Sequence, residues 1–134
     1  MIHRRRVDKE GRSELHYAAL DRDRKKALQL INNGVPVNLQ CKQGWTALHC
    51  AAESNSPEIA LALIAAGAEL ELRDKFGNTP LWRATMASKG SGALINILLE
   101  AGADRNAQNN SGVSPLSLAK TIGNFNVVQF YEAP

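Results

Sequence analysis

The side chains best suited to metal binding or acid–base chemistry in this chain are three histidines and two cysteines. They are His3, His16, His49, Cys41 and Cys50. A structural zinc site would need cysteines in a CxxC pair or histidines a few residues apart, and neither pattern occurs. Two cysteines are also too few for the disulfide framework of a small secreted domain. The sequence therefore predicts no metal site and favours two reduced thiols in a cytoplasmic protein.

Sequence motifs of nucleophilic, phosphate-binding and dinucleotide-binding sites are also absent. There is no GxSxG nucleophile elbow and no glycine loop followed by GK[ST]. The KGSG segment at residues 89–92 lacks the dinucleotide fingerprint. Asp21 and Asp23 alternate with Arg22 and Arg24, which is typical of a solvated face and not of paired catalytic carboxylates. We expect a non-catalytic protein without a cofactor.

Length and composition indicate one globular domain. The chain has 134 residues, of which 44% are hydrophobic, 22% charged and 5% aromatic, with a formal net charge of +3. No apolar run reaches the 18 or so residues of a membrane-spanning helix, and the longest, residues 59–68, is interrupted by Gly67. The basic start, MIHRRRVDKEGR, is not followed by the apolar region of a signal peptide. These features favour a cytoplasmic protein that does not enter a membrane.

The positions of His16 and His49 belong to an internal repeat. Four similar segments open with a glycine, at Gly11, Gly44, Gly77 and Gly112, so that the spacings are 33, 33 and 35 residues. A second glycine follows each of the first three after 23, 23 and 25 residues, at Gly34, Gly67 and Gly102. Two landmarks that recur in phase indicate a stacked array of like units.

Each unit carries the signals of two short helices. A hydroxyl residue two positions after the opening glycine can cap the first helix, at Ser13, Thr46, Thr79 and Ser114. Pro80 and Pro115 suit the first helical turn, and Pro57 suits the start of a second helix. Leu48, Ala51 and Ala52 form a narrow apolar stripe at i, i+3, i+4 spacing. Gly67 and Gly102 are expected to end the second helices.

This pattern resembles the ankyrin repeat. The matching segments are TALHCAA at residues 46–52, TPL at 79–81 and LLEAGADRNAQNNSG at 98–112, and the resemblance extends over residues 7–131. It implies an all-α solenoid of stacked helix-turn-helix units with β-hairpin-like fingers. We expect a basic tail at residues 1–6 and a single domain at 7–134, with repeats at about 8–40, 41–73, 74–108 and 109–134. The resemblance implies that His16 and His49 form hydrogen bonds within their own repeat and to the neighbouring repeat.

Members of this family usually bind proteins through finger tips and inner helices, so we expect one protein partner and a chain that is monomeric by itself. Trp45 and Phe76 are expected to be exposed anchors, although each could instead pack on a neighbouring finger. Trp82 replaces the family histidine and is expected to be half-buried, while Arg83 is expected in the groove. The full set of candidate partner-binding residues is Lys42, Gln43, Trp45, Glu53, Ser54, Lys75, Phe76, Asn78, Trp82, Arg83, Met86 and Asn110.

Small size favours an immunity-type inhibitor of a toxin or enzyme, with an adaptor or scaffold as the alternative. A second alternative is binding to nucleic acid or another anionic surface, because residues 1–33 carry nine basic against five acidic residues. That surface would use Arg4, Arg5, Arg6, Arg22, Arg24, Lys25 and Lys26. The third unit has two extra residues near 88–92, which are interpreted as a tolerated loop or as a partner-specific projection.

Overall fold

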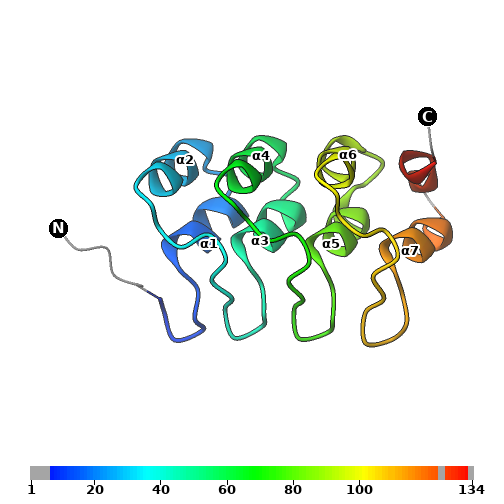
Figure 1. The fold of residues 1–134 in the computed structure, drawn as a ribbon, viewed down its shortest axis with the longest axis horizontal. Coiled ribbons are helices and arrows are strands. Elements are labelled where there is room, and N and C mark those ends of the chain that lie inside the picture. Colours follow the sequence, from blue (N-terminus) through cyan, green and yellow to red (C-terminus); the bar gives the residue numbers. More distant parts are fainter. Residues whose placement is uncertain (1–6, 124–125, 133–134) are drawn as a thin grey trace.

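The computed structural model describes residues 7–123 and 126–132, and the expected tail at residues 1–6 lies outside them. Its elements are α1 (Glu14–Leu20), α2 (Arg24–Asn32), α3 (Ala47–Glu53), α4 (Pro57–Ala65), α5 (Pro80–Ala87), α6 (Ala93–Glu100), α7 (Pro115–Thr121) and the 3₁₀ helix η1 (Val127–Tyr131). Figure 1 shows α1, α3, α5 and α7 in an inner row, α2, α4 and α6 in an outer row, and looped fingers that extend beyond the inner row. The prediction of an all-α repeat solenoid is confirmed.

The inner helices begin at the predicted hydroxyl residues. Each capping side chain accepts a hydrogen bond from the backbone N–H three residues later, which satisfies one of the free donors of the first turn. The caps are Ser13, Thr46, Thr79 and Ser114. Pro80 and Pro115 occupy the first helical position, where the lack of an N–H costs nothing.

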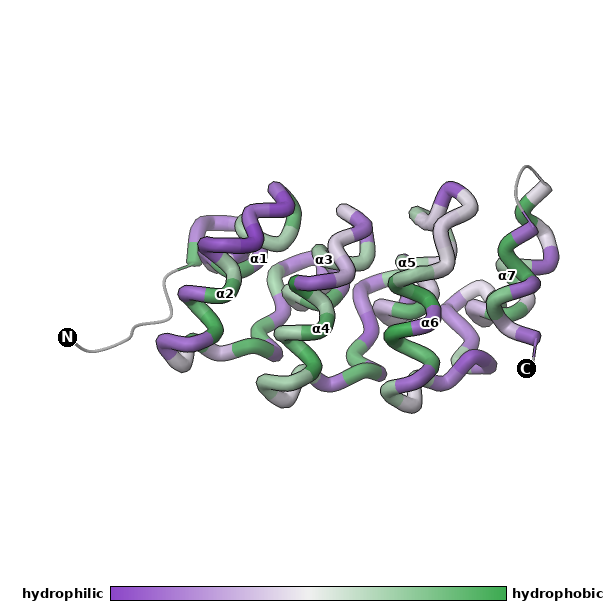
Figure 2. The backbone as a smooth tube through the Cα atoms, turned by 90° about the horizontal axis from the view of Figure 1, so that it is seen from above, coloured by the Kyte–Doolittle hydropathy of each residue, from purple (hydrophilic) through white to green (hydrophobic). Residues whose placement is uncertain are grey.

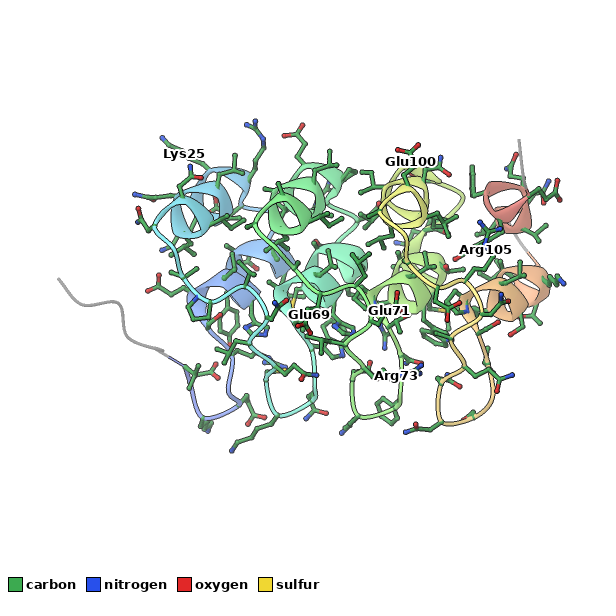
Figure 3. The ribbon with its side chains drawn as sticks, viewed as in Figure 1. Lys25, Glu69, Glu71, Arg73, Glu100 and Arg105 are labelled. Atoms are coloured by element: carbon green, nitrogen blue, oxygen red, sulfur yellow. The ribbon has the colours of Figure 1, made fainter. Side chains whose placement is uncertain are left out.

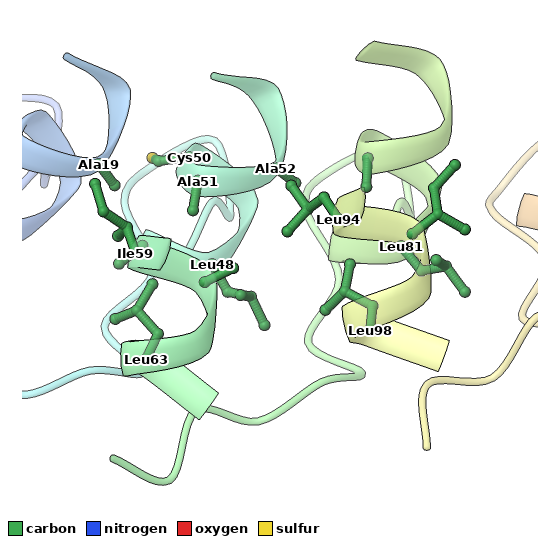
Figure 4. Close-up of a cluster of buried hydrophobic side chains, with 14 of the residues drawn as sticks. Ala19, Leu48, Cys50, Ala51, Ala52, Ile59, Leu63, Leu81, Leu94 and Leu98 are labelled. Atoms are coloured by element: carbon green, nitrogen blue, oxygen red, sulfur yellow. The ribbon is translucent and has the colours of Figure 1, made fainter. Parts of the chain in front are cut away.

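The core is one continuous cluster that fills the space between the two helices of each pair and the space between successive pairs. Leu48, Ile59 and Leu63 are almost fully buried, and they point into the space between neighbouring units (Figure 4). Ala51 and Ala52 face the adjacent inner helices with at most 1% of their surface exposed. Small side chains at these positions let inner helices approach closely, while the larger residues fill the space towards the outer row.

The first unit presents a polar face to the solvent. Figure 2 shows the approach to α2 in the hydrophilic colour, whereas α4 and α6 are mostly hydrophobic. Arg22, Arg24 and Lys25 are exposed there, and Arg24 forms an ion pair with Glu58 of α4. The charged residues of this turn are therefore solvated or paired with the neighbouring unit.

The fingers share one backbone geometry. In each, the residue before the tip donates to the carbonyl four residues later, as Asp74 does to Asn78 at 3.0 Å. A backbone hydrogen bond also joins each finger to the next. Lys42 N–H donates to Glu10 O at 2.8 Å, and Lys75 N–H donates to Gln43 O at 2.9 Å. Within the described residues the only β pairing is an isolated bridge between Val7 and Ser13, so the fingers are turns and not strands.

Glycine is required at the base of the fingers because the chains approach closely there. Gly44 has a φ of +83°, and a Cβ on it would lie 2.7 Å from the Cα of Asp74 in the next finger. Any side chain at this position would both strain the backbone and separate the two fingers. The repeated opening glycine is thus a stacking contact as well as a turn residue.

Two histidines fasten inner helices to the following finger. In His49, Nδ1 accepts the backbone N–H of Thr46 at 3.1 Å, and Nε2–H donates to the carbonyl of Asn78 at 2.8 Å. His16 repeats this arrangement one unit earlier with Ser13 and Trp45. Burial lowers the pKa of His49 to about 4 and also lowers that of His16. Both rings therefore stay neutral at pH 7, the state that these hydrogen bonds require.

The fourth unit ends in a 3₁₀ turn where a second helix was expected. Tyr131 of η1 is buried, its hydroxyl bonds to Thr85 of α5, and burial raises its pKa to about 12. Arg105 lies between η1 and α7, and its Nη1 donates to the carbonyl of Tyr131 at 2.6 Å (Figure 3).

The two extra residues of the third unit contact this C-terminal turn. The insertion lies between α5 and α6, as expected, and Gly92 at its end is buried beneath the ring of Phe130. A Cβ on Gly92 would lie 2.3 Å from Phe130 Cδ1. The altered loop thus accommodates a large residue of the closing turn.

Replacing Gly92 with alanine should force Phe130 to move and lower the free energy of unfolding by about 1–3 kcal/mol, the usual cost of overpacking. Gly123→Ala is the matched control, because its Cβ would meet nothing within 4 Å. Urea unfolding followed by circular dichroism measures both. Equal stability of the two variants would show that Phe130 does not need the space above Gly92.

Acid should destabilise the fold through His49. The folded state holds a neutral ring down to about pH 4, whereas the unfolded chain takes up a proton below about 6.5. Stability from this group is complete above pH 6.5 and is lost as the pH falls towards 4, by roughly 3 kcal/mol in total. Urea unfolding from pH 7 to 4.5 should show a shallower pH dependence for His49→Gln than for the wild type. Identical slopes, or a His49 NMR titration near 6.5, would contradict this assignment.

Candidate functional site

A hollow of about 450 Å³ lies where the fingers meet the inner helices of the first three units. We call it the finger-side pocket. Its lining residues are Arg12, His16, Leu20, Cys41, Gln43, Trp45, Cys50, Glu53, Phe76 and Arg83. They come from α1, α3, α5 and three fingers, so the pocket exists only when the units are stacked.

Trp45 forms a wall of this pocket and is not the exposed anchor that was predicted. Its ring is half-buried and stacks on His49, with ring centroids 6.2 Å apart and an interplanar angle of 24°. The residue follows Gly44, where the finger turns back towards α3, and this turn carries the indole onto the helices. One edge of the ring remains available at the pocket surface.

Arg83 covers Trp45 from the neighbouring unit. Its guanidinium carbon lies 4.9 Å from the Trp45 ring centroid and 5.3 Å from that of Trp82. Nη2 lies 3.5 Å from Asp74 Oδ2, and Nη1 lies 3.7 Å from Glu53 Oε1. The side chain is 18% exposed, which agrees with its expected place at the groove. Stacking and charge together hold the guanidinium in one position at the pocket surface.

Asp74 is a site residue that the sequence interpretation missed. Its side chain is fully buried, and Oδ1 accepts the backbone N–H groups of Phe76 and Asn78 at 2.9 Å each. The second oxygen faces Arg83. An alignment of the four repeats could have pointed to Asp74, since Asp8, Cys41 and Asn109 occupy the same position in the other fingers.

Eight of the other ten predicted residues lie in the pocket, at exposed positions or at an inter-repeat contact. Gln43, Glu53 and Phe76 line the pocket, with Phe76 58% exposed. Exposed side chains at the finger tips are Lys42, Lys75 and Asn110, and Met86 is 51% exposed at the end of α5. Ser54 is half-buried and donates to the carbonyl of Ala19 at 2.7 Å, so its hydroxyl serves an inter-repeat contact.

Two predicted residues are too buried to contact a partner. Asn78 is 4% exposed, because its Oδ1 accepts a hydrogen bond from Asn109 Nδ2 at 2.8 Å across the fingers. Trp82 is buried and not half-buried, since the indole is enclosed between units. Within the described residues its N–H has no hydrogen-bond partner, so the third unit lacks the tie that His16 and His49 provide. Arg73 supplies another connection there by donating to the carbonyl of Gln108 at 2.6 Å (Figure 3).

The thiols and imidazoles in and behind the pocket are buried, and the imidazoles are hydrogen-bonded at both nitrogens. Cys41 and Cys50 are free thiols, and burial raises the pKa of Cys50 far above its ordinary value, which keeps it protonated. His16 and His49 are neutral and have both ring nitrogens engaged. Among residues 7–123 and 126–132, no three histidine, cysteine or acidic side chains gather as metal ligands would.

None of the helices in the described part of the chain combines the length and apolar character needed to cross a bilayer. A search of curated proteins gave no significant match. The model of the family "Ankyrin repeats (3 copies)" matches residues 2–74, and the "Ankyrin repeat" model matches residues 76–110. Together these matches cover most of the sequence, and they agree with the repeated capping residues, finger turns and helix pairs. The chain therefore belongs to the ankyrin-repeat family.

Proposed function

We propose that this protein binds one protein partner, without catalysis, through the finger-side pocket and the adjoining finger tips. Ankyrin repeats are generally protein–protein interaction modules. The observation that carries the proposal is the stack of Arg83 on Trp45, with the exposed ring of Phe76 beside it at the same pocket. Arginine, tryptophan and other aromatic residues dominate the binding energy of protein interfaces.

The pocket is preorganised for this role. Trp45 is held by His49 beneath it, and Arg83 is held by Asp74 and Glu53. Side chains that are already fixed lose little conformational entropy when a partner binds. A rigid surface of this kind can therefore recognise its partner with few contacts.

For the finer role we propose a stoichiometric inhibitor of immunity type, which covers the active site of a toxin or other enzyme. The support is that one pocket, formed by three of four units, offers room for one partner. An adaptor that bridges two proteins would need a second surface of comparable character. An activity assay on the captured partner separates the two roles, because an adaptor would leave the enzyme's turnover unchanged. We further propose a monomer in the reducing cytoplasm, in keeping with two buried free thiols.

Binding to nucleic acid through the basic first third is the competing function. The described part of that cluster is partly neutralised, because Arg24 pairs with Glu58, and Lys26 Nζ lies 3.9 Å from Glu14 Oε2. These contacts favour a solvated end of the array over a phosphate-binding surface. A salt titration with nucleic acid decides, since phosphate contacts give binding that weakens steeply with salt.

Capture of the native partner from the source cell tests the proposed site. Trp45→Ala and Phe76→Ser should each reduce partner recovery, with affinity falling about tenfold or more, as for central interface residues. Leu61→Ser is the matched control, because Leu61 is an apolar side chain of α4 that is 52% exposed outside the pocket. If the partner is retained by both pocket variants, or lost equally with Leu61→Ser, the binding surface lies elsewhere.

A further inference from the structure

We propose that the finger-side pocket binds an acidic protein segment that inserts one apolar side chain, so that carboxylates on either side meet the basic finger tips. This inference rests on the proposed function and names the chemistry of the partner. It follows from three features: cations at the edge of the pocket, an apolar interior, and a row of lysines, Lys9, Lys42 and Lys75, that crosses the finger tips.

Several cations at the edge of the pocket have no ion-pair partner among the described residues. Arg12, Lys42 and Lys75 have no carboxylate within 4.0 Å among the described residues, whereas Arg83 is already shared by two acids. The Asp8 carboxylate accepts hydrogen bonds from the backbone N–H groups of Glu10 and Arg12 and from the Tyr17 hydroxyl, but it keeps its negative charge and offsets part of the charge of nearby Arg12. Lys42 and Lys75 are the edge cations that attract negative charge from outside the molecule most strongly.

The interior of the pocket is suited to an apolar group. Leu20, the protonated thiol of Cys50 and the indole of Trp45 line it, and the exposed ring of Phe76 lies at the same pocket. A volume of about 450 Å³ accommodates one large side chain together with part of the backbone that carries it. Burying this surface supplies affinity, while the charges around it set orientation and partner choice.

The lysines of the finger tips are arranged across the repeats and not along a helix. Lys9, Lys42 and Lys75 occupy the same exposed position in successive fingers, exactly one repeat apart in sequence, whereas the fourth finger carries the neutral Asn110. Packed helices lie about 10 Å apart, and an extended chain advances about 3.3 Å per residue. An extended segment with an acidic residue at about every third position therefore follows this row of lysines.

A protein segment fits these features better than a nucleic acid. Glu53 lies in the pocket and would repel a phosphate backbone that entered it. Trp45 is half-buried with Arg83 on one face, which leaves no open platform for stacked bases. A single inserted side chain avoids Glu53 and still brings its acidic neighbours to the fingers.

The test begins with a display library of random linear peptides, selected on the immobilised full-length protein. The selected peptides should be enriched in Asp and Glu around one aliphatic or aromatic residue. The strongest is then labelled, and its affinity is measured by fluorescence anisotropy. A version in which lysine replaces each acid should lose binding, and raising the salt concentration should weaken binding of the acidic version.

Variants of the protein locate the contact. Replacing Arg12, Lys42 and Lys75 together with glutamine should weaken peptide binding about tenfold or more, at about 2- to 5-fold for each charge. Phe76→Ser should weaken it as well. Lys25→Gln removes an exposed lysine of α2 on the side away from the fingers (Figure 3) and should leave binding unchanged.

Selection of neutral or basic peptides, selection of none, or acidic peptides that ignore the triple variant would each overturn the proposal. A single-stranded DNA oligonucleotide that displaces the peptide and needs the same cations would overturn it in favour of nucleic acid. Capture of the native partner distinguishes failure of this inference from failure of the proposed function. If Phe76→Ser loses the partner but the triple variant retains it, the acidic segment alone is rejected. If both Phe76→Ser and Trp45→Ala retain the partner, the proposed function is rejected.

Discussion

Burial of each unit's apolar surface against the next unit is the constraint on which this structure depends. Leu48 of α3 and Ile59 and Leu63 of α4 belong to one cluster of buried side chains that runs through the described units. The last described element joins the same cluster, because Tyr131 of η1 is buried in it and Phe130 packs against it.

Stacking also produces the candidate site. Arg83 belongs to the third unit and Trp45 to the second, yet the guanidinium lies on the indole. The fingers that frame the pocket are joined by backbone hydrogen bonds and tied to the inner helices by His16 and His49. The elements that stabilise the array are thus the ones that position the side chains of the candidate site.

Periodic features could be read from the sequence because each is a local event that recurs. A hydroxyl before a helix, a proline in its first turn and a glycine after its end report backbone geometry within a few residues. Exposure was harder to predict. Trp45 and Asn78 occupy equivalent finger positions, yet the indole folds back onto His49, and the amide bonds sideways to Asn109. Which way a side chain turns depends on neighbours one repeat away.

By itself, the sequence determined the ankyrin-type period, the helix pairs with their caps, and the finger turns, because these depend on short-range conformational preferences repeated four times. It also placed Gln43, Glu53, Phe76 and Arg83 among the candidate residues. Only the tertiary structure decided that these side chains surround one pocket, that Asp74 is buried behind Arg83, and that Gly92 lies beneath Phe130. The pocket and the Gly92–Phe130 contact join residues of different units, and the Asp74–Arg83 contact depends on how a finger packs on α5; local preferences specify none of these.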